Sequence, residues 1–108
     1  MSNAEILDRL FATIMSRQGA DPETSWTAKL FSQGRNKIVQ KVGEEALEMN
    51  IAALVEGPEE LAAESADVLY HMLVLWADAG ITPDDVWAQL AKREGQSGIE
   101  EKRARGDL

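Results

Sequence analysis

The sequence predicts an all-α fold, a helical bundle of about four to five helices that forms a single domain over residues 1–108. Apolar residues recur three and four positions apart along most of the chain, which is the spacing of one helix face. Glycine and proline separate these stretches, and no stretch alternates between apolar and polar residues as a half-buried strand would. A chain of 108 residues with 44% hydrophobic residues is long enough to bury roughly two-thirds of its unfolded surface.

The first two helices are predicted within the N-terminal third of the chain. Ser2 and Glu5 have the spacing of a capping box, and the apolar residues that follow have a helical period as far as Gly19. A turn-like segment comes next. A short helix over about residues 26–33 then ends at Gly34, because glycine is favoured immediately after a helix.

Three further helices are predicted, over about residues 36–55, 58–79 and 82–94. Gly57 and Pro58 form a firm break between the first two of these. Thr82 is the expected N-cap of the third, with Pro83 at its first helical position. The remaining residues are rich in glycine and then in charge, which indicates a mobile tail over residues 95–108 or a segment that orders when substrate binds.

The composition excludes several classes of protein. The net charge is −8 at pH 7, from 19 acidic against 11 basic residues, whereas a nucleic-acid-binding domain normally has a basic excess or stripe. No apolar run approaches the ~20 residues that span a bilayer, and without cysteine there is no disulfide framework or thiolate metal site. We therefore expect a cytoplasmic protein with neither a nucleic-acid nor a membrane partner.

Two acidic pairs have the same spacing on consecutive helices. Glu45 and Glu48 lie in the helix over residues 36–55, and Glu64 and Asp67 lie in the next. At ~100° per residue, Glu45 and Glu64 border the apolar stripes of their helices. Because a short Gly-Pro connection favours antiparallel packing, we expect the four carboxylates to converge at the edge of the seam. Converging carboxylates need compensating charge, and an all-oxygen ligand set favours Mg²⁺, with Mn²⁺ as the alternative.

Other interpretations of these acidic pairs remain open. A solvated acidic face is one, since glutamate is a good helix former and the chain has 19 acids. A di-iron carboxylate bundle is another, but such sites usually contain Glu-x-x-His motifs. The only histidine, His71, lies seven residues after Glu64 and four after Asp67, which argues against iron. His71 itself is either a core group or a contact of the reaction site.

Basic and aromatic residues flank the acidic helix. Arg35, Lys37 and Lys41 cluster at its start, and the two lysines share a face. Lys41 either pairs with Glu45 one turn on or meets a phosphate chain that the metal also holds. Trp26, on the short helix, is the tryptophan best placed to stack on a base, while the other two tryptophans are expected in the core or an interface.

Three segments of the chain carry a family resemblance: SWTAKLFSQGRNKIVQKVGEEALE, AAESADVLYHMLVL and GQSGIEEKRAR. In this order they resemble the phosphoribosyl-ATP pyrophosphatase family, a branch of the MazG-like all-α nucleotide pyrophosphohydrolases, over about residues 5–105. The metal motif of that superfamily is E-x-x-E followed at some distance by E-x-x-D. Its positions here are Glu45 and Glu48, then Glu64 and Asp67, and Glu44 completes a fuller E-E-x-x-E.

The resemblance implies an activity, a partner and roles for these residues. The activity is Mg²⁺-dependent hydrolysis of 1-(5-phosphoribosyl)-ATP to 1-(5-phosphoribosyl)-AMP and pyrophosphate, the second step of histidine biosynthesis, by a tight homodimer. The four motif acids would hold the metal, and Glu44 and Glu45 are candidate catalytic acids that orient the attacking water. The expected substrate contacts are Arg35, Lys37, Lys41 and His71. A house-cleaning pyrophosphohydrolase acting on ordinary or damaged nucleoside triphosphates and a non-catalytic helical dimerisation module are the alternatives.

Overall fold

A computed structural model describes residues 3–95 and 97–107 of the chain, and its secondary structure is helical. The described residues contain six α-helices and no strand. The helices are α1 (Glu5–Ser16), α2 (Trp26–Gln33), α3 (Arg35–Val55), α4 (Pro58–Ala79), α5 (Pro83–Ala91) and α6 (Gly98–Arg105). The predicted all-α class is therefore confirmed. None of the helices in these two ranges is both long enough and apolar enough to cross a bilayer.

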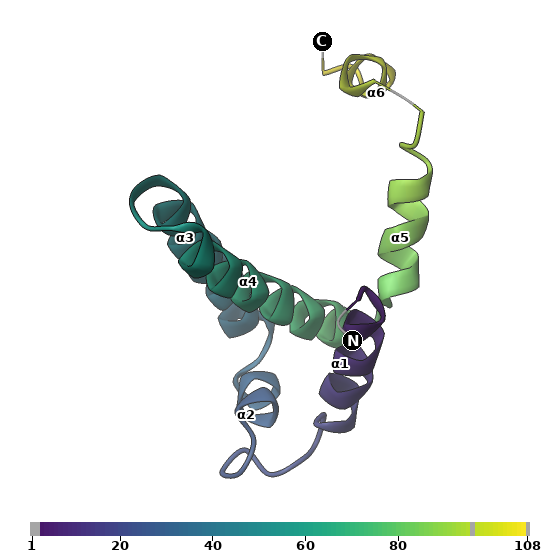
Figure 1. Ribbon diagram of the computed structural model, residues 1–108. Helices are drawn as coiled ribbons and strands as arrows, with labels where there is room; N and C mark the ends of the chain where they lie inside the picture. Colours follow the sequence, from purple (N-terminus) through teal and green to yellow (C-terminus); the bar gives the residue numbers. More distant parts are fainter. Residues whose placement is uncertain (1–2, 96, 108) are drawn as a thin grey trace.

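The centre of the fold is an antiparallel hairpin of α3 and α4 (Figure 1). In the turn between them, the N–H of Gly57 donates to Glu60 Oε2 at 3.2 Å. Pro58 then opens α4, because a first helical position needs no N–H donor. Ile38 of α3 and Leu73 of α4 are fully buried in the seam between the helices. The predicted Gly-Pro break thus brings the two acidic helices side by side.

Two short helices cover the end of the hairpin at which α3 starts and α4 finishes (Figure 1). Ile14 of α1 and Leu30 of α2 belong to the same buried core as the hairpin seam. Ser25 caps α2 as its Oγ accepts from the Ala28 N–H at 3.1 Å. In the first turn of α2, Thr27 Oγ1 is hydrogen-bonded to the hydroxyl of Tyr70 in α4. The position of α2 relative to the acidic helices is therefore set by both apolar packing and a polar contact.

The start of α1 differs from the capping-box prediction. The helix begins at Glu5 with Ala4 as its N-cap, and the side chain of Asn3 accepts from the Glu5 N–H at 2.9 Å. An asparagine oxygen can satisfy an unpaired N–H at a helix start as well as serine does. Ser2, the predicted cap, lies outside the described residues.

The last two helices extend away from the hairpin (Figure 1). Thr82 and Asp85 cap α5 reciprocally: the N–H of Thr82 donates to Asp85 Oδ2 at 2.8 Å, and the N–H of Asp85 donates to Thr82 Oγ1 at 3.3 Å. Within the segment predicted as a tail, α6 forms after Ser97, which exchanges capping bonds of 3.0 and 3.3 Å with Glu100. The radius of gyration is 16.1 Å, compared with about 13 Å for a compact domain of this length. One chain by itself is therefore more extended than a self-contained globule.

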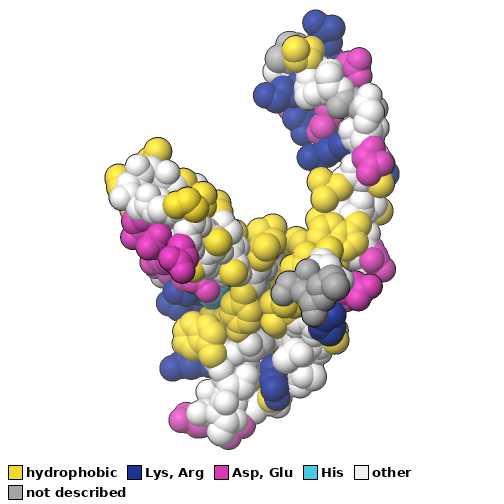
Figure 2. Space-filling view, viewed as in Figure 1, with side chains coloured by type: hydrophobic (Ala, Val, Ile, Leu, Met, Phe, Trp, Pro, Cys, Tyr) yellow, Lys and Arg dark blue, Asp and Glu magenta, His cyan; other side chains and the backbone are white. Residues whose placement is uncertain are grey.

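An apolar stripe lies on the outer face of α3, away from α4. It begins at Leu47 and continues through Ile51 to Leu54 and Val55 at the free end of the hairpin, and all four side chains are exposed. Leu54 is 83% exposed and Val55 is 76% exposed. Figure 2 shows hydrophobic side chains gathered at this free end. Isolated exposed apolar residues are ordinary, but a continuous stripe on one helix face is typical of an interaction surface.

Candidate active site

Three carboxylates from the two long helices meet at the edge of the hairpin. Glu45 and Glu48 are one turn apart on α3, and Glu64 reaches them from α4, so that one ligand atom of each lies within 4.8 Å of the others. Glu45 is only 8% exposed, whereas Glu64 is half-buried and Glu48 is exposed. The structure therefore brings together three of the four acids that the sequence predicted to converge. We call this group the carboxylate cluster.

The fourth predicted acid, Asp67, is exposed and stands outside the carboxylate cluster. It follows Glu64 by three residues on α4, which turns its side chain about 60° away from that of Glu64. Its side chain is also one methylene shorter than that of glutamate. The backbone carbonyl of Asp67 accepts a hydrogen bond from His71 Nδ1 at 2.7 Å.

The carboxylate cluster carries more negative charge than the one lysine beside it compensates. The pKa of the Glu48 carboxyl is raised, first by the negative charge of Glu45, then by hydrogen bonding with Glu45, desolvation and the charge of Glu64. Among the described residues, Glu64 Oε2 is buried without a hydrogen-bond partner. A buried carboxylate oxygen without a donor is costly unless a cation or a water satisfies it. These two observations fit a divalent cation held by oxygen ligands.

Lys41 is the cation next to the cluster. Its Nζ lies 3.4 Å from Glu45 Oε1 and 3.6 Å from Glu44 Oε1. Burial lowers the pKa of Lys41, but hydrogen bonding with Glu45 and the charges of Glu45 and Glu44 outweigh it, so this pKa is raised overall. The pairing with Glu45 that the sequence left open as one alternative is therefore present. Lys37, one turn earlier on α3, is half-buried.

Glu44 stays on the exposed side of α3 and is held in its ionised form. The pKa of Glu44 is lowered, first by a hydrogen bond from Gln40, whose Nε2 lies 3.3 Å from Glu44 Oε2. Desolvation opposes this shift, and the charge of Lys41 adds to it. Gln40 was not singled out in the sequence, although its spacing of four residues from Glu44 is that of helix-surface neighbours.

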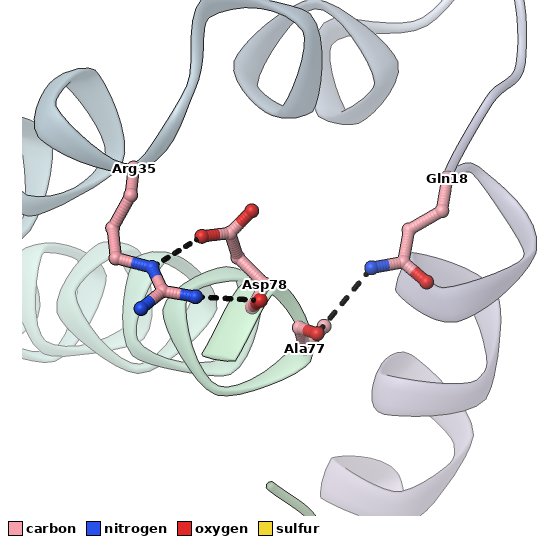
Figure 3. Close-up of polar contacts among 4 residues, drawn as sticks. All are labelled: Gln18, Arg35, Ala77 and Asp78. Carbon is pink, nitrogen blue, oxygen red and sulfur yellow. Dashed lines mark hydrogen bonds and ion pairs between the residues drawn. The ribbon is translucent and has the colours of Figure 1, made fainter. Parts of the chain in front are cut away.

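Arg35 does not lie at the carboxylate cluster. Its Nε is 2.7 Å from Asp78 Oδ2, and a second guanidinium nitrogen donates to the Asp78 carbonyl at 2.9 Å (Figure 3). In the same region, the side chain of Gln18 donates to the carbonyl of Ala77 at 3.3 Å (Figure 3). The Asp78 carbonyl, in the last turn of α4, has no N–H partner within the helix, whereas the Ala77 carbonyl also accepts from the N–H of Gly80 at 3.3 Å. Arg35 precedes Glu45 by ten residues, or about 15 Å along α3.

His71 is enclosed by the fold, with 5% of its surface exposed. Its ring meets that of Tyr70 edge-on, with centroids 4.9 Å apart. Because a carbonyl oxygen can only accept, Nδ1 donates the hydrogen bond to the carbonyl of Asp67. Nε2 is buried with no hydrogen-bond partner in the described part of the chain. Little of the imidazole is therefore accessible from the surface.

Comparisons with known proteins agree on one family. A family model described as phosphoribosyl-ATP pyrophosphohydrolase matches residues 7–94, which include every candidate site residue. A protein of Rhodospirillum rubrum is 70% identical over 101 residues, covering 94% of this chain and 86% of its own length. Proteins of Paramagnetospirillum magneticum and Azospirillum brasilense are 59% and 61% identical over 103 residues, with 94% and 93% of their own lengths covered. All three relatives are named phosphoribosyl-ATP pyrophosphatase.

Proposed function

The chain belongs to the phosphoribosyl-ATP pyrophosphohydrolase family, and on that premise we propose that it hydrolyses 1-(5-phosphoribosyl)-ATP to 1-(5-phosphoribosyl)-AMP and pyrophosphate. It is a hydrolase of histidine biosynthesis. The observation that carries the proposed mechanism is the meeting of Glu45, Glu48 and Glu64 from two helices within 4.8 Å. An isolated acidic pair on a solvated helix face would not explain a buried, unpartnered oxygen on Glu64.

The ligands that the chain offers fit Mg²⁺, with Mn²⁺ as the alternative. Glu45, Glu48 and Glu64 supply oxygen donors only, which hard divalent cations prefer. Asp67, one turn from Glu64 on α4, is the fourth proposed ligand. When bound, such a cation neutralises charge on phosphoryl oxygens and on the leaving pyrophosphate.

The remaining residues bind phosphate and handle the attacking water. Glu44 and Glu45, adjacent on α3, are the proposed catalytic acids that orient the attacking water. Lys41 and Lys37 are the proposed phosphate contacts, since an ammonium group binds phosphate as a compact positive charge.

Arg35 and His71 are also proposed substrate contacts, but in the structure neither side chain is free to meet a ligand directly. A phosphate would have to compete with Asp78 for the guanidinium of Arg35. A ligand can meet His71 only where the buried Nε2 becomes accessible.

The proposed partner of the chain is a second copy of itself. Within residues 3–95 and 97–107, no element covers the apolar stripe from Leu47 to Val55, and the radius of gyration exceeds that of a compact domain. Homodimer interfaces are enriched in apolar surface of this kind. Cytoplasmic location and the lack of nucleic-acid and membrane partners stay predictions from the sequence.

The decisive test measures pyrophosphate release from phosphoribosyl-ATP with Mg²⁺ and with excess EDTA. We expect release only with the metal. A parallel panel of deoxynucleoside triphosphates tests the house-cleaning alternative, which requires clear preference for one of them over phosphoribosyl-ATP. Absence of release from every nucleotide would leave the non-catalytic dimerisation module.

A further inference from the structure

A cavity of about 570 Å³ lies beside α2, apart from the carboxylate cluster. It is formed by the turn before α2 and one face of that helix, and none of the proposed metal ligands lines it. We call it the α2 cavity. Its lining includes Glu23, Trp26, Lys29 and Gln33.

The lining of the α2 cavity has the chemistry of a nucleotide site. Trp26 is 49% exposed, and an exposed indole face can stack on a heteroaromatic base. Lys29 supplies the one positive charge of the lining, and within the described residues no carboxylate lies within 4.0 Å of it. Glu23 and Gln33 offer oxygen acceptors for sugar hydroxyls. Base, phosphate and sugar therefore each have a matching side chain.

The α2 cavity is close enough to the carboxylate cluster to share one ligand with it. Thr27, the neighbour of Trp26, is hydrogen-bonded to Tyr70. Tyr70 follows Glu64 by six residues, or about 9 Å along α4. With helices packed roughly 8–10 Å apart, Thr27 lies on the order of 13 Å from Glu64 along the backbone of the two helices. This separation is comparable to the reach of an extended nucleoside triphosphate.

Two lysines lie along α3 between the end of α2 and the carboxylate cluster. Lys37 and Lys41 lie on α3 between its start, where α2 ends, and the carboxylate cluster. Figure 2 shows basic and hydrophobic side chains together over α2 and the beginning of α3, next to the acidic side chains farther along α3. A triphosphate running from the α2 cavity to the cluster would pass these lysines.

We propose that the α2 cavity binds the phosphoribosyl-adenine end of the substrate and thereby distinguishes phosphoribosyl-ATP from ATP. Trp26 stacks on the adenine, and Lys29 binds the 5-phosphate of the ribose attached at position 1 of the base. ATP lacks this second ribose phosphate, so that it leaves Lys29 without a partner. The inference rests on the proposed function, because it takes phosphoribosyl-ATP as the substrate.

The test compares kcat/KM for phosphoribosyl-ATP with kcat/KM for ATP in the wild type and in Lys29→Met. The variant keeps the length of the side chain and removes its charge. We expect the ratio of the two values to fall about tenfold, since a hydrogen bond to a charged group contributes enough for that factor. Lys92→Met, which changes an exposed lysine at the end of α5, is the matched control and should keep the wild-type ratio.

A binding experiment without metal separates recognition from turnover. Titrating phosphoribosyl-AMP into the protein in EDTA should quench the fluorescence of the exposed Trp26, and Trp26→Phe should lose that quench. A wild-type ratio in Lys29→Met, or an unchanged quench in Trp26→Phe, would overturn the inference while leaving the proposed function intact. A wild-type enzyme with no preference for phosphoribosyl-ATP would instead refute the proposed function, and the inference with it.

Discussion

Replacing Glu64 with glutamine should move the stability of this protein in opposite directions with and without metal. Glu64→Gln keeps the volume of the side chain but removes one of the three charges of the carboxylate cluster. Without metal, the loss of a repelling charge stabilises the fold. With metal, the loss of a ligand reduces the gain that cation binding provides.

The size of the metal-free effect follows from the geometry of the cluster. Two unit charges 4.8 Å apart repel by about 3 kcal/mol at an effective dielectric constant of ~20, and by about 1 kcal/mol in water. Lys41, which lies 3.4 Å from Glu45, compensates part of the local charge, so that the lower figure is the safer expectation. A change of about 1 kcal/mol raises the Tm of a domain of this size by roughly 4 °C.

The metal effect is set by mass action. A ligand that binds only the folded protein contributes about 2.7 kcal/mol when its free concentration is a hundredfold above Kd. The stability that saturating Mg²⁺ adds to the wild type should therefore exceed the roughly 1 kcal/mol that Glu64→Gln adds in EDTA. The variant should show little of that gain.

The assay is thermal unfolding followed by circular dichroism, first in EDTA and then across a MgCl₂ titration at constant ionic strength. Glu59→Gln is the matched control, because it removes the same charge from the exposed first turn of the same helix. An acid in a first turn interacts favourably with the helix dipole, so that this control should lower Tm slightly and keep the full Mg²⁺ response. If Glu64→Gln lowered Tm in EDTA and kept the wild-type Mg²⁺ response, the metal-cluster argument would be refuted.

Three other changes test separate parts of the proposal. Glu45→Gln should reduce kcat/KM for phosphoribosyl-ATP by about a hundredfold or more while the circular dichroism spectrum keeps its helical form; full turnover would remove Glu45 from the mechanism. Leu54→Glu should convert a dimer to a monomer in light scattering, whereas Ile6→Glu on the exposed side of α1 should not, and a persisting dimer would exclude the apolar stripe as the interface. The negative charge of Glu45 raises the pKa of Glu48 in the folded protein. Protonated Glu48 therefore favours the folded state, and this contribution to the metal-free stability is fully present below the unfolded pKa of Glu48. It is lost as the pH rises through the raised folded pKa. Glu48→Gln should flatten that part of the stability profile in EDTA, and coincident profiles would show that the repulsion is not felt.

Local sequence signals were sufficient for the first five helices and for most of the carboxylate cluster. Gly57 and Pro58 marked the hairpin turn, and helical periodicity placed Glu45 and Glu64 beside the seam. The capping-box spacing of Ser97 and Glu100 was equally available as a signal for α6, but the glycine-rich and charged composition around it outweighed this short motif. A helix was thus predictable wherever the apolar periodicity and the glycine or proline residues at its ends agreed.

Long-range contacts were not predictable in the same way. Arg35 and Asp78 are 43 residues apart, and nothing in the spacing of either residue indicates the other. The sequence placed Arg35 with the phosphate-binding lysines because it is close to them along the chain. In the folded protein its guanidinium instead satisfies a carboxylate and a carbonyl at the end of α4. The burial of His71 likewise depends on which residues of other helices cover it.

One alignment of α3 against α4 accounts for both the Arg35–Asp78 pair and the carboxylate cluster. The ion pair lies where α3 starts and α4 ends, and Glu48 meets Glu64 farther toward the turn of the same hairpin. A slip by one helical turn would displace Glu64 by about 5.4 Å along α3, which is more than the 4.8 Å that now encloses the ligand atoms. The geometry for metal binding therefore depends on the apolar seam around Ile38 and Leu73, because that packing rather than the acids holds the two helices in register.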